Sequence, residues 1–429
     1  MVRCILSRVP FLTLGLTLVT AAQATDWPQW RGPDRSGHVP AGARVPSGLA
    51  TEPHLVWRRP AGEGFASPVV ASDKVLVFDN QAGKETLRAL AASDGAEVWR
   101  ATIDETFRDE QGPPGPRCTP LVDGDRVYAQ SGLGELQCLD LRDGQVKWRV
   151  NFRKDFGAPF LGEDSIIPGA AEHGYTASPV VDGNRLIACV GSTNGAGVVA
   201  FDKASGTVLW KSLNDLAAYA APLVTPLAGS PQCVAFTVEG MVGLRPTDGA
   251  ELWRVPLKTS YGRHCATPVV VDDTVFGGSY KSGLFAARIA KAGAGYTATR
   301  VWTNTEVSVN FSSPVAIGRH LYALGTQKDV VCVELETGKI SWSKRRYINR
   351  SADVAHAGFM AFGDRVFLLT DDGEGILFAA DPSVCRELGR AQLCGLNWCN
   401  PAYADGRLYL RDGIKSTGTI YCYDLLAPR

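Results

Sequence analysis

The residues best suited to chemistry stand just before a proline that recurs along the chain. A Ser/Thr-Pro-Val/Leu-Val run, or a close variant of it, opens each of a series of apolar segments, and a polar or aromatic approach precedes it. Loops that lead into such segments carry function more often than the segments themselves. The approach residues are Phe65, Arg117, Cys118, His173, Tyr175, Tyr219, Tyr261, Arg263, His264, Cys265, Asn310, Phe311, His356, Asn397, Trp398 and Cys399.

Two kinds of site are compatible with this set. Imidazole and thiolate groups are preferred ligands of transition metals, but no local spacing resembles a chelating motif, and residues from separate repeats need not converge to the ~2.0 to 2.3 Å that metal bonds require. We therefore predict a ligand-binding mouth and no metal, with a solvent-filled lining as the remaining alternative. The candidate mouth residues are Arg117, His173, Tyr175, Tyr261, Arg263, His264, Asn310, His356, Asn397 and Trp398.

Signatures of catalysis are missing from the sequence. It contains no Gly-x-Ser-x-Gly, no His-Glu-x-x-His and no Walker-type loop. The glycine-rich run at 191–197 joins two predicted strands and opens no helix, so we interpret it as a hairpin loop and not as a phosphate cradle. We predict no catalytic residues.

The approach residues are positioned by a repeat with two landmarks. The strand-opening landmark occurs at Pro68, Pro120, Pro179, Pro222, Pro268, Pro314 and Pro401, with Phe359 in the aligned place of the seventh unit. A closing Asp/Ser/Thr-Gly-x-x-x-Trp landmark ends at Trp99, Trp148, Trp210, Trp253 and Trp342, and Trp302 follows a degenerate turn. Eight units spaced about 40 to 60 residues apart are typical of propeller blades.

Each unit contains short alternating strands separated by Asp-Gly or Gly-rich turns. In the second unit the pattern predicts strands at 120–122, 126–131, 135–141 and 146–150. Four strands in each of eight units predict an all-β, eight-bladed propeller of four-stranded antiparallel blades. Trp57 resembles a closing residue with no unit before it, and the last unit lacks a closing strand, so we expect the N-terminal strand around Trp57 to close the ring.

The N-terminal residues predict export. Residues 1–24 combine Arg3 and Arg8 with an apolar stretch and an Ala-Gln-Ala end, as in a cleaved signal peptide. Cys4 precedes the apolar stretch, so we expect no lipid anchor and a secreted or periplasmic protein.

Residues 25–54 are predicted to be an extension packed on the propeller (55–429), with its tryptophans against the side of the propeller in preference to a peptide-recognition arm. The mature chain would carry 42 basic against 44 acidic residues, which disfavours nucleic acid or membrane as a partner.

The cysteines fall into two groups. Cys138, Cys332 and Cys422 occupy one repeat position inside apolar strands and are predicted to be small buried residues. Cys385 and Cys394, nine residues apart and flanking a Gly-Arg turn, are the best candidates for a disulfide.

The repeat (Pro-Val-Val, Gly-x-Leu-x-x-Leu-Asp, Thr/Asp-Gly-x-x-x-Trp) resembles that of secreted bacterial PQQ-like propellers, in the quinoprotein alcohol dehydrogenase-like superfamily. The mature N-terminal Asp-Trp-Pro-Gln-Trp-Arg-Gly-Pro run is similar to one subfamily. The resemblance implies that the closing tryptophans dock between neighbouring blades: Trp57, Trp99, Trp148, Trp210, Trp253, Trp302 and Trp342. The propeller lipoprotein that assists outer-membrane barrel assembly has a similar repeat.

Two functions follow as expectations. The favoured one is a non-catalytic binding or scaffold propeller, expected to be a monomer, that holds a protein or small polar ligand at the mouth without a cofactor. The alternative is a soluble oxidoreductase for an alcohol or sugar, using PQQ and calcium held by carboxylates from Glu63, Asp109, Glu163, Asp164 or Glu172. Adjacent cysteines and a Cys-x-x-Cys-His haem motif, which the dehydrogenase resemblance implies, are absent. The insertions at 104–117 and 152–173 are candidate lids or partner surfaces.

Overall fold

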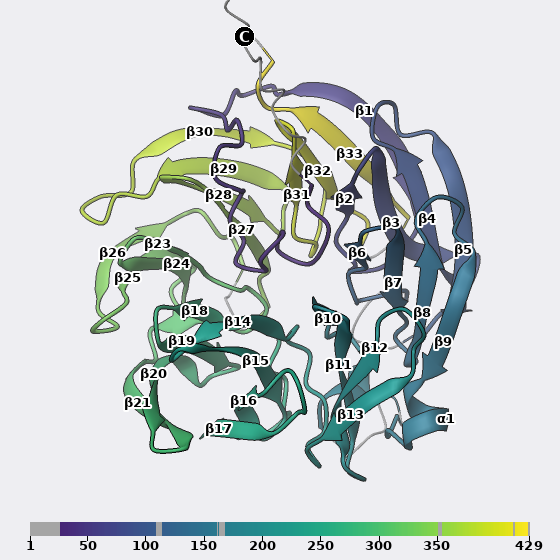
Figure 1. Cartoon of the computed structure of the whole chain (residues 1–429). Helices are drawn as coiled ribbons and strands as arrows, with labels where there is room; N and C mark the ends of the chain where they lie inside the picture. The colour runs from purple at the N-terminus through teal and green to yellow at the C-terminus, as the bar shows by residue number, and fades with distance from the viewer. Residues whose placement is uncertain are drawn as a thin grey trace, which may run out of the picture.

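The computed structural model shows eight antiparallel sheets arranged as blades around a ring (Figure 1). It describes residues 26–108, 114–160, 162, 168–350, 354–414 and 417–427. The predicted signal peptide lies outside these residues. Sequential strands are neighbours within each blade except at the ring closure and in blade 6, where both β22 and β23 pair with β24, so the fold follows the repeat directly.

The first four blades follow one another in chain order. Their strands are β2 (Val69–Ala71), β3 (Lys74–Gln81), β4 (Lys84–Ala91) and β5 (Glu97–Glu105) in blade 1; β6 (Leu121–Asp123), β7 (Arg126–Gln130), β8 (Glu135–Asp140) and β9 (Val146–Asn151) in blade 2; β10 (Val180–Asp182), β11 (Arg185–Ser192), β12 (Ala196–Asp202) and β13 (Val208–Ser212) in blade 3; and β14 (Leu223–Leu227), β15 (Ser230–Thr237), β16 (Gly240–Leu244) and β17 (Glu251–Pro256) in blade 4.

The remaining blades complete the ring. Their strands are β18 (Val269–Val271), β19 (Thr274–Ser279), β20 (Gly283–Ala292) and β21 (Gly295–Asn304) in blade 5; β22 (Val307–Ser308), β23 (Val315–Ile317), β24 (His320–Gly325), β25 (Asp329–Glu334) and β26 (Ile340–Arg345) in blade 6; β27 (Ala357–Phe362), β28 (Arg365–Thr370), β29 (Glu374–Ala379) and β30 (Glu387–Gln392) in blade 7; and β31 (Ala402–Ala404), β32 (Arg407–Arg411), β33 (Gly418–Asp424) and β1 (His54–Ala61) in blade 8.

The repeat landmarks lie where the sequence predicts them. Seven inner strands begin directly after the recurring proline, and β27 contains Phe359 of the seventh unit. The second blade matches its four predicted strands to within one residue, and the glycine-rich run at 191–197 lies in the β11–β12 hairpin. Two short helices, α1 (Phe152–Phe156) and α2 (Ala170–His173), lie in the second insertion and escaped sequence analysis because each is too short to show a periodic apolar stripe.

The closing tryptophans bind one blade to the next. Six of the seven predicted docking residues donate their indole Nε1–H to a backbone carbonyl of the following blade, at 2.8 to 3.1 Å: Trp57, Trp99, Trp148, Trp210, Trp302 and Trp342. Trp253 differs, because its indole donates to Gln232 Oε1 within its own blade. The indole of Trp99 lies against Gly144 of the next blade, where a Cβ would approach it to 2.6 Å and where the backbone has a φ of +73°. Only glycine suits both requirements.

A small residue faces each closing tryptophan across the blade. Cys138, Cys332 and Cys422 pair with Trp148, Trp342 and Trp57, respectively. All three cysteines are fully buried, as predicted. Alanine or glycine takes this position in the blades that lack the cysteine, opposite Trp99, Trp210, Trp253 and Trp302. The thiols therefore serve as small apolar groups that leave room for an indole ring.

The ring is closed by the first strand, as the sequence predicts. Strand β1 pairs antiparallel with β33 over seven residue pairs, from His54 with Asp424 to Ala61 with Gly418. Trp57 on β1 then docks on blade 1 through Ala92 O at 3.1 Å. Closure therefore joins strands from distant parts of the chain, and it covers the edge of β33 that would otherwise be free.

Residues 26–39 of the N-terminal segment lie against the innermost strands, whereas Leu49 further along donates its N–H to Leu388 O on the outermost strand of blade 7. Trp27 pairs with Val70 of blade 1, and His38 pairs with Ala361 of blade 7. Between them the buried Arg31 donates to Ser313 O at 3.0 Å and Pro314 O at 2.6 Å, both at the start of blade 6. In Figure 1 this purple segment runs from β1 into the ring. We call residues 26–39 the axial plug.

Arg35 anchors the plug on the other side of the ring. Its guanidinium donates to Ser178 O at 2.9 Å, to Pro222 O at 2.8 Å and to Pro179 O. Burial lowers the pKa of both Arg31 and Arg35 to about 10, so both remain charged at neutral pH. The prediction that the N-terminal tryptophans pack against the side of the propeller is therefore wrong. The buried arginines need acceptors, and carbonyls at the inner strand starts supply them.

The predicted disulfide is not formed. Cys385 and Cys394 are free thiols that lie before and after β30, so a six-residue strand of roughly 20 Å separates them. A disulfide needs Cα atoms within about 7 Å. All other cysteines among the described residues are free as well.

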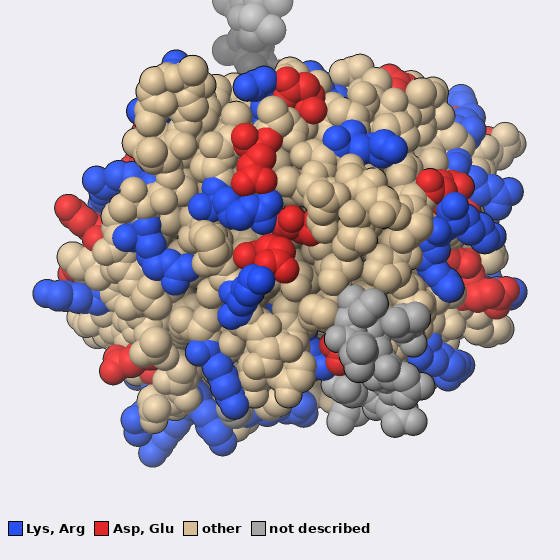
Figure 2. Space-filling model, turned by 90° about the horizontal axis from the view of Figure 1, so that it is seen from below, with Lys and Arg blue, Asp and Glu red and all other residues tan. Residues whose placement is uncertain are grey.

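The surface carries both signs of charge. On the side seen in Figure 2, basic and acidic side chains are interspersed, in agreement with 44 basic and 44 acidic residues in the whole chain. Within the part of the chain that the structure describes, no helix is long and apolar enough to cross a membrane.

Replacing Trp57 by alanine tests the closure. We expect Trp57→Ala to lower the free energy of unfolding by about 3 to 5 kcal/mol, because it removes a buried ring that joins blades 8 and 1. Leu55→Ala on the same strand is the control, since Leu55 is 39% exposed and should cost less than about 1 kcal/mol. Urea denaturation followed by circular dichroism measures both, and equal small losses would contradict the closure.

Replacing Arg35 by methionine tests the plug. We expect Arg35→Met to speed amide hydrogen exchange at Trp27 and Val39 at least tenfold, because the carbonyls of Ser178 and Pro222 lose their charged donor. Arg44→Met, in the same segment but with an exposed side chain, should leave exchange unchanged. Unchanged protection in Arg35→Met would show that the guanidinium does not hold the plug.

Candidate functional site

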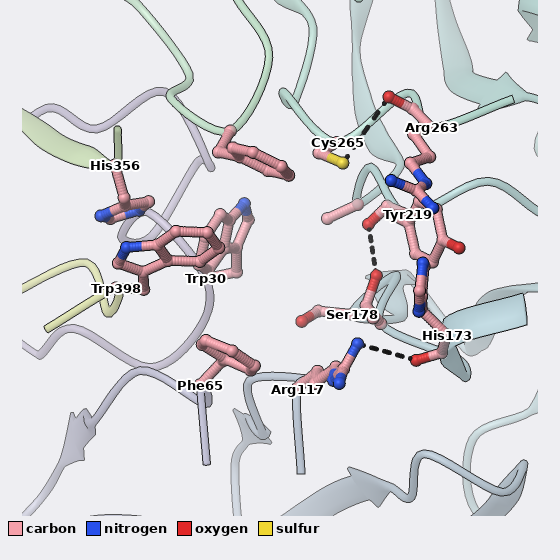
Figure 3. A pocket seen from close by; sticks show the side chains of 13 residues that line it. Trp30, Phe65, Arg117, His173, Ser178, Tyr219, Arg263, Cys265, His356 and Trp398 are labelled. Atoms are coloured by element: carbon pink, nitrogen blue, oxygen red, sulfur yellow. Dashed lines mark hydrogen bonds between the residues drawn. The ribbon is translucent and has the colours of Figure 1, made fainter. Parts of the chain in front are cut away.

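A pocket of about 230 Å³ opens where the eight inner strands begin. Every blade contributes to it through the approach to its inner strand, and the plug contributes Trp30 (Figure 3). Trp30 is held by its indole Nε1–H, which donates to Thr267 Oγ1 at 2.7 Å. The described lining residues are Trp30, Phe65, Arg117, His173, Thr176, Ser178, Tyr219, Ala221, Arg263, Cys265, Phe311, His356 and Trp398.

One wall of the pocket is aromatic. The ring of Trp398 lies 5.6 Å from that of Phe65, 5.0 Å from that of Phe311 and 6.4 Å from that of His356, centroid to centroid. Figure 3 shows Phe65, His356 and Trp398 together with Trp30 on one side of the pocket. The four rings come from blades 8, 1, 6 and 7, which are neighbours around the ring. This arrangement offers stacking and apolar contact to a flat ligand.

The opposite wall is polar. Arg117 donates to His173 O at 3.0 Å, and its guanidinium lies 5.2 Å from the centre of the Phe65 ring. Arg263 donates to both oxygens of Glu172, at 2.6 and 3.3 Å, and His173 Nε2 lies 3.2 Å from the same carboxylate. This wall therefore presents guanidinium groups on the side facing the rings (Figure 3).

A buried carboxyl group supports the polar wall from behind. Glu85 is fully buried and accepts from Gly132 N at 3.1 Å. Gly132 O in turn accepts from Tyr175 N at 3.0 Å, next to the segment that presents His173. Burial, reinforced by the nearby Asp104, raises the pKa of Glu85 to about 8. The carboxyl group of Glu85 is thus largely protonated at neutral pH. It therefore holds Gly132, and through it the segment that presents His173, without adding a negative charge.

Burial shifts the pKa of two titratable side chains that line the pocket, His356 and Cys265. Burial lowers the pKa of His356 to about 4, so its ring is neutral. Burial raises the pKa of the Cys265 thiol to about 12, which keeps it protonated, and a protonated thiol is a weak nucleophile. The arrangement is suited to binding.

Five of the ten predicted mouth residues line the pocket: Arg117, His173, Arg263, His356 and Trp398. The other five do not. Tyr175, His264, Asn310 and Asn397 are buried behind the wall. His264 stacks on Phe236 at 4.4 Å and approaches Val238 O at 3.2 Å, and Tyr261 lies at the rim, 47% exposed.

Sequence reasoning placed some lining residues in the approaches without selecting them: Phe65, Tyr219, Cys265 and Phe311. It missed Thr176, Ser178 and Ala221, and it did not bring Trp30 to the pocket. In an extended segment successive side chains point to opposite sides, and this alternation could have separated the approach residues that line the pocket from those buried behind it. Arg263 and Cys265 face the pocket, so His264 between them faces the core.

The two insertions meet beside the pocket. The rings of Phe107 and Phe160 lie 5.0 Å apart, edge to face, and Tyr175 OH donates to Pro159 O at 3.1 Å. Pro116 O accepts from Phe65 N at 2.8 Å, which fixes the start of the aromatic wall. Both insertions therefore border the mouth, where we predict lids or partner surfaces.

The described residues contain no group of three or more His, Cys, Asp or Glu side chains arranged to hold a metal. Of the carboxylates predicted for calcium, Asp109, Glu163 and Asp164 lie outside the described residues. Glu172 is engaged by Arg263 and His173, and Glu63 accepts from Asn80 at 2.8 Å. The described residues therefore do not fit a calcium site beside a quinone.

Fold and site together define an eight-bladed propeller of the PQQ-like type with an axial binding pocket. A family model described as outer membrane protein assembly factor BamB matches residues 47–169 and 83–344, which is more than half of the chain. The protein belongs to this family of PQQ-like repeat propellers.

Relatives and solved structures agree with this assignment. The outer membrane protein assembly factor BamB of Shewanella oneidensis is 22% identical over 379 residues, 84% of this chain and 86% of the relative. That of Yersinia pestis is 23% identical over 362 residues, covering 77% and 81%. The crystal structure of BamB from Moraxella catarrhalis has a TM-score of 0.54 at 16% identity, covering 85% and 96%.

The dehydrogenase branch has the same fold. Quinohemoprotein alcohol dehydrogenase from Comamonas testosteroni superimposes with a TM-score of 0.65 at 13% identity, covering 94% of this chain and 81% of that chain. At this identity the likeness establishes the architecture and carries no conclusion about activity.

The raised pKa of Glu85 predicts a pH dependence of stability. An unfolded glutamic acid ionises near pH 4.5 and the folded group near 8, so the unfolded state releases its proton first and stability falls as pH rises between these values. We expect Glu85→Gln to remove a slope of up to about 1.4 kcal/mol per pH unit. Urea denaturation from pH 5 to 8 measures it, with Glu105→Gln on the exposed end of β5 as control. If the free energy of unfolding of wild type and of Glu85→Gln changed with pH in parallel, the raised pKa of Glu85 would be contradicted.

Proposed function

We propose that the protein is a non-catalytic scaffold of the cell envelope or exterior that holds a protein partner or ligand at the mouth pocket. The observation that carries the proposal is the pocket itself, to which all eight blades and the plug contribute side chains. A neutral His356 and a protonated Cys265 favour binding over chemistry. The relatives named as outer membrane protein assembly factors support a role in protein contact.

Location follows from the same comparison and from the first residues of the chain. The predicted signal peptide and the assembly-factor relatives support an envelope or secreted protein. The alternative, a PQQ- and calcium-dependent oxidoreductase, has the fold of the dehydrogenases in its favour, but Glu172 is committed to Arg263, so we do not favour it.

Site-specific photo-crosslinking in the producing bacterium tests the proposal. We expect a photoreactive phenylalanine analogue at Tyr261, on the exposed rim, to capture one partner, because the rim borders the pocket. Asp364, 84% exposed in the β27–β28 turn at the far end of an inner strand, is the control and should capture none.

A second variant separates contact at the mouth from chance capture. Adding Trp398→Ala to the Tyr261 probe removes the centre of the aromatic wall without touching the rim, and it should abolish the adduct. An adduct that persists in this variant, or one that forms equally at position 364, would contradict a partner at the mouth.

A further inference from the structure

The two walls of the mouth pocket differ in chemistry, and this difference restricts what can bind. The aromatic wall offers the ring of Trp398 with the rings of Phe65 and Phe311 at 5.6 and 5.0 Å from it, centroid to centroid. The polar wall offers the guanidinium groups of Arg117 and Arg263. Figure 3 shows Trp398 and Arg263 on opposite sides of the same space, with Arg117 between them beside Phe65.

The charge of the lining is one-sided. Both charged side chains among the described lining residues are arginines, and no Asp or Glu lines the pocket there. Glu172 stands behind the wall, where it orients Arg263 and His173. His356 is neutral at neutral pH. A cationic ligand would meet two guanidinium groups, so aromatic recognition of an ammonium group is disfavoured, whereas a carboxylate gains charge-assisted hydrogen bonds.

The size of the pocket limits the ligand further. An apolar cavity of about 150 Å³ accommodates a benzene molecule. The pocket encloses about 230 Å³, which suits one aromatic ring plus a short chain that ends in a small polar group. Because the plug closes the pocket at Trp30, the ring has a floor as well as a wall, and only the polar end faces the arginines.

We propose that the mouth pocket binds a single aromatic ring linked through a short chain to a carboxylate, with the ring against Phe65, Phe311 and Trp398 and the carboxylate on Arg117 and Arg263. This inference rests on the mouth being the binding site and names the chemistry that it recognises. Two sources supply this chemistry: a free aromatic acid, or the C-terminal residue of a protein chain that ends in phenylalanine.

Calorimetric titration with three matched probes tests the carboxylate. The probes are 3-phenylpropanoate, 3-phenylpropanamide and 3-phenylpropylamine, which share the ring and chain and differ in charge. We expect the acid to bind at least about tenfold more tightly than the amide, as charge-assisted hydrogen bonds are stronger than neutral ones, and the amine not to bind. Equal binding of acid and amide, or tighter binding of the amine, would overturn the proposal.

Variants assign the preference to named side chains. Arg117→Gln and Arg263→Gln should each reduce the preference for the acid over the amide, because each removes one of the two charged donors to the carboxylate. Arg319→Gln, on the surface with 64% of the side chain exposed, is the matched control and should keep the preference. A tenfold preference that survives in both Arg117→Gln and Arg263→Gln would contradict the assignment.

A peptide arm distinguishes the two sources. A hexapeptide that ends in phenylalanine is compared with the same peptide amidated at its C-terminus and with one that carries phenylalanine internally. Binding of the free-acid peptide alone identifies a chain terminus, and binding of 3-phenylpropanoate without any peptide identifies a free acid.

If no acid binds but crosslinking at Tyr261 still captures a partner, the ligand chemistry is wrong and the scaffold role stands. If the acid binds and crosslinking captures nothing, the proposed scaffold role is wrong and the ligand chemistry stands.

Discussion

The contact between a closing tryptophan and the turn of the next blade is the interaction on which the rest of the structure depends. A blade presents two apolar faces and is stable only when neighbours cover both. The indole covers the following blade, donates to its backbone and leaves space for only a glycine in the turn, as at Trp99 and Gly144. A small residue on the neighbouring strand completes the space, which explains cysteines such as Cys138 without any redox role. Because Trp57 makes the same contact from the first strand, the ring closes through the two ends of one chain.

Closure of the ring also determines the kind of site that the molecule can offer. Eight inner strands leave an axial space, and the plug fills it with Arg31 and Arg35 bonded to carbonyls from opposite sides of the ring. The mouth is thus a blind pocket with Trp30 as its floor. The side chains that line it come from approaches distributed over the whole sequence, so the binding surface depends on complete assembly of the ring. Its arginines and rings are suited to recognition, and at neutral pH its His356 is neutral and its Cys265 thiol is protonated.

The architecture could be predicted from the sequence because its signals are local and repeated. A proline before seven of the eight inner strands and a tryptophan in seven of the eight closing strands define the blades whatever their distance in space, and the unmatched Trp57 is enough to reveal the closure. The site could be predicted only in part, because alternation decides which residue of an approach faces inward: Trp398 lines the pocket while its neighbour Asn397 is buried and donates to Thr370 O. Trp30 could not be placed, because its position depends on arginines that reach carbonyls more than a hundred residues away in sequence.

The central claim is that the protein binds its partner through the mouth of the ring and not through the blade edges or the opposite face. Hydrogen–deuterium exchange of the purified protein, alone and in the isolated complex with its crosslinked partner, measures this directly. The account predicts slower exchange in the approach segments at 116–119, 173–178, 261–267 and 396–400, with no change in the turns at 93–96 and 363–365. Protection confined to those turns or to outer strands, with the approach segments unchanged, would contradict it.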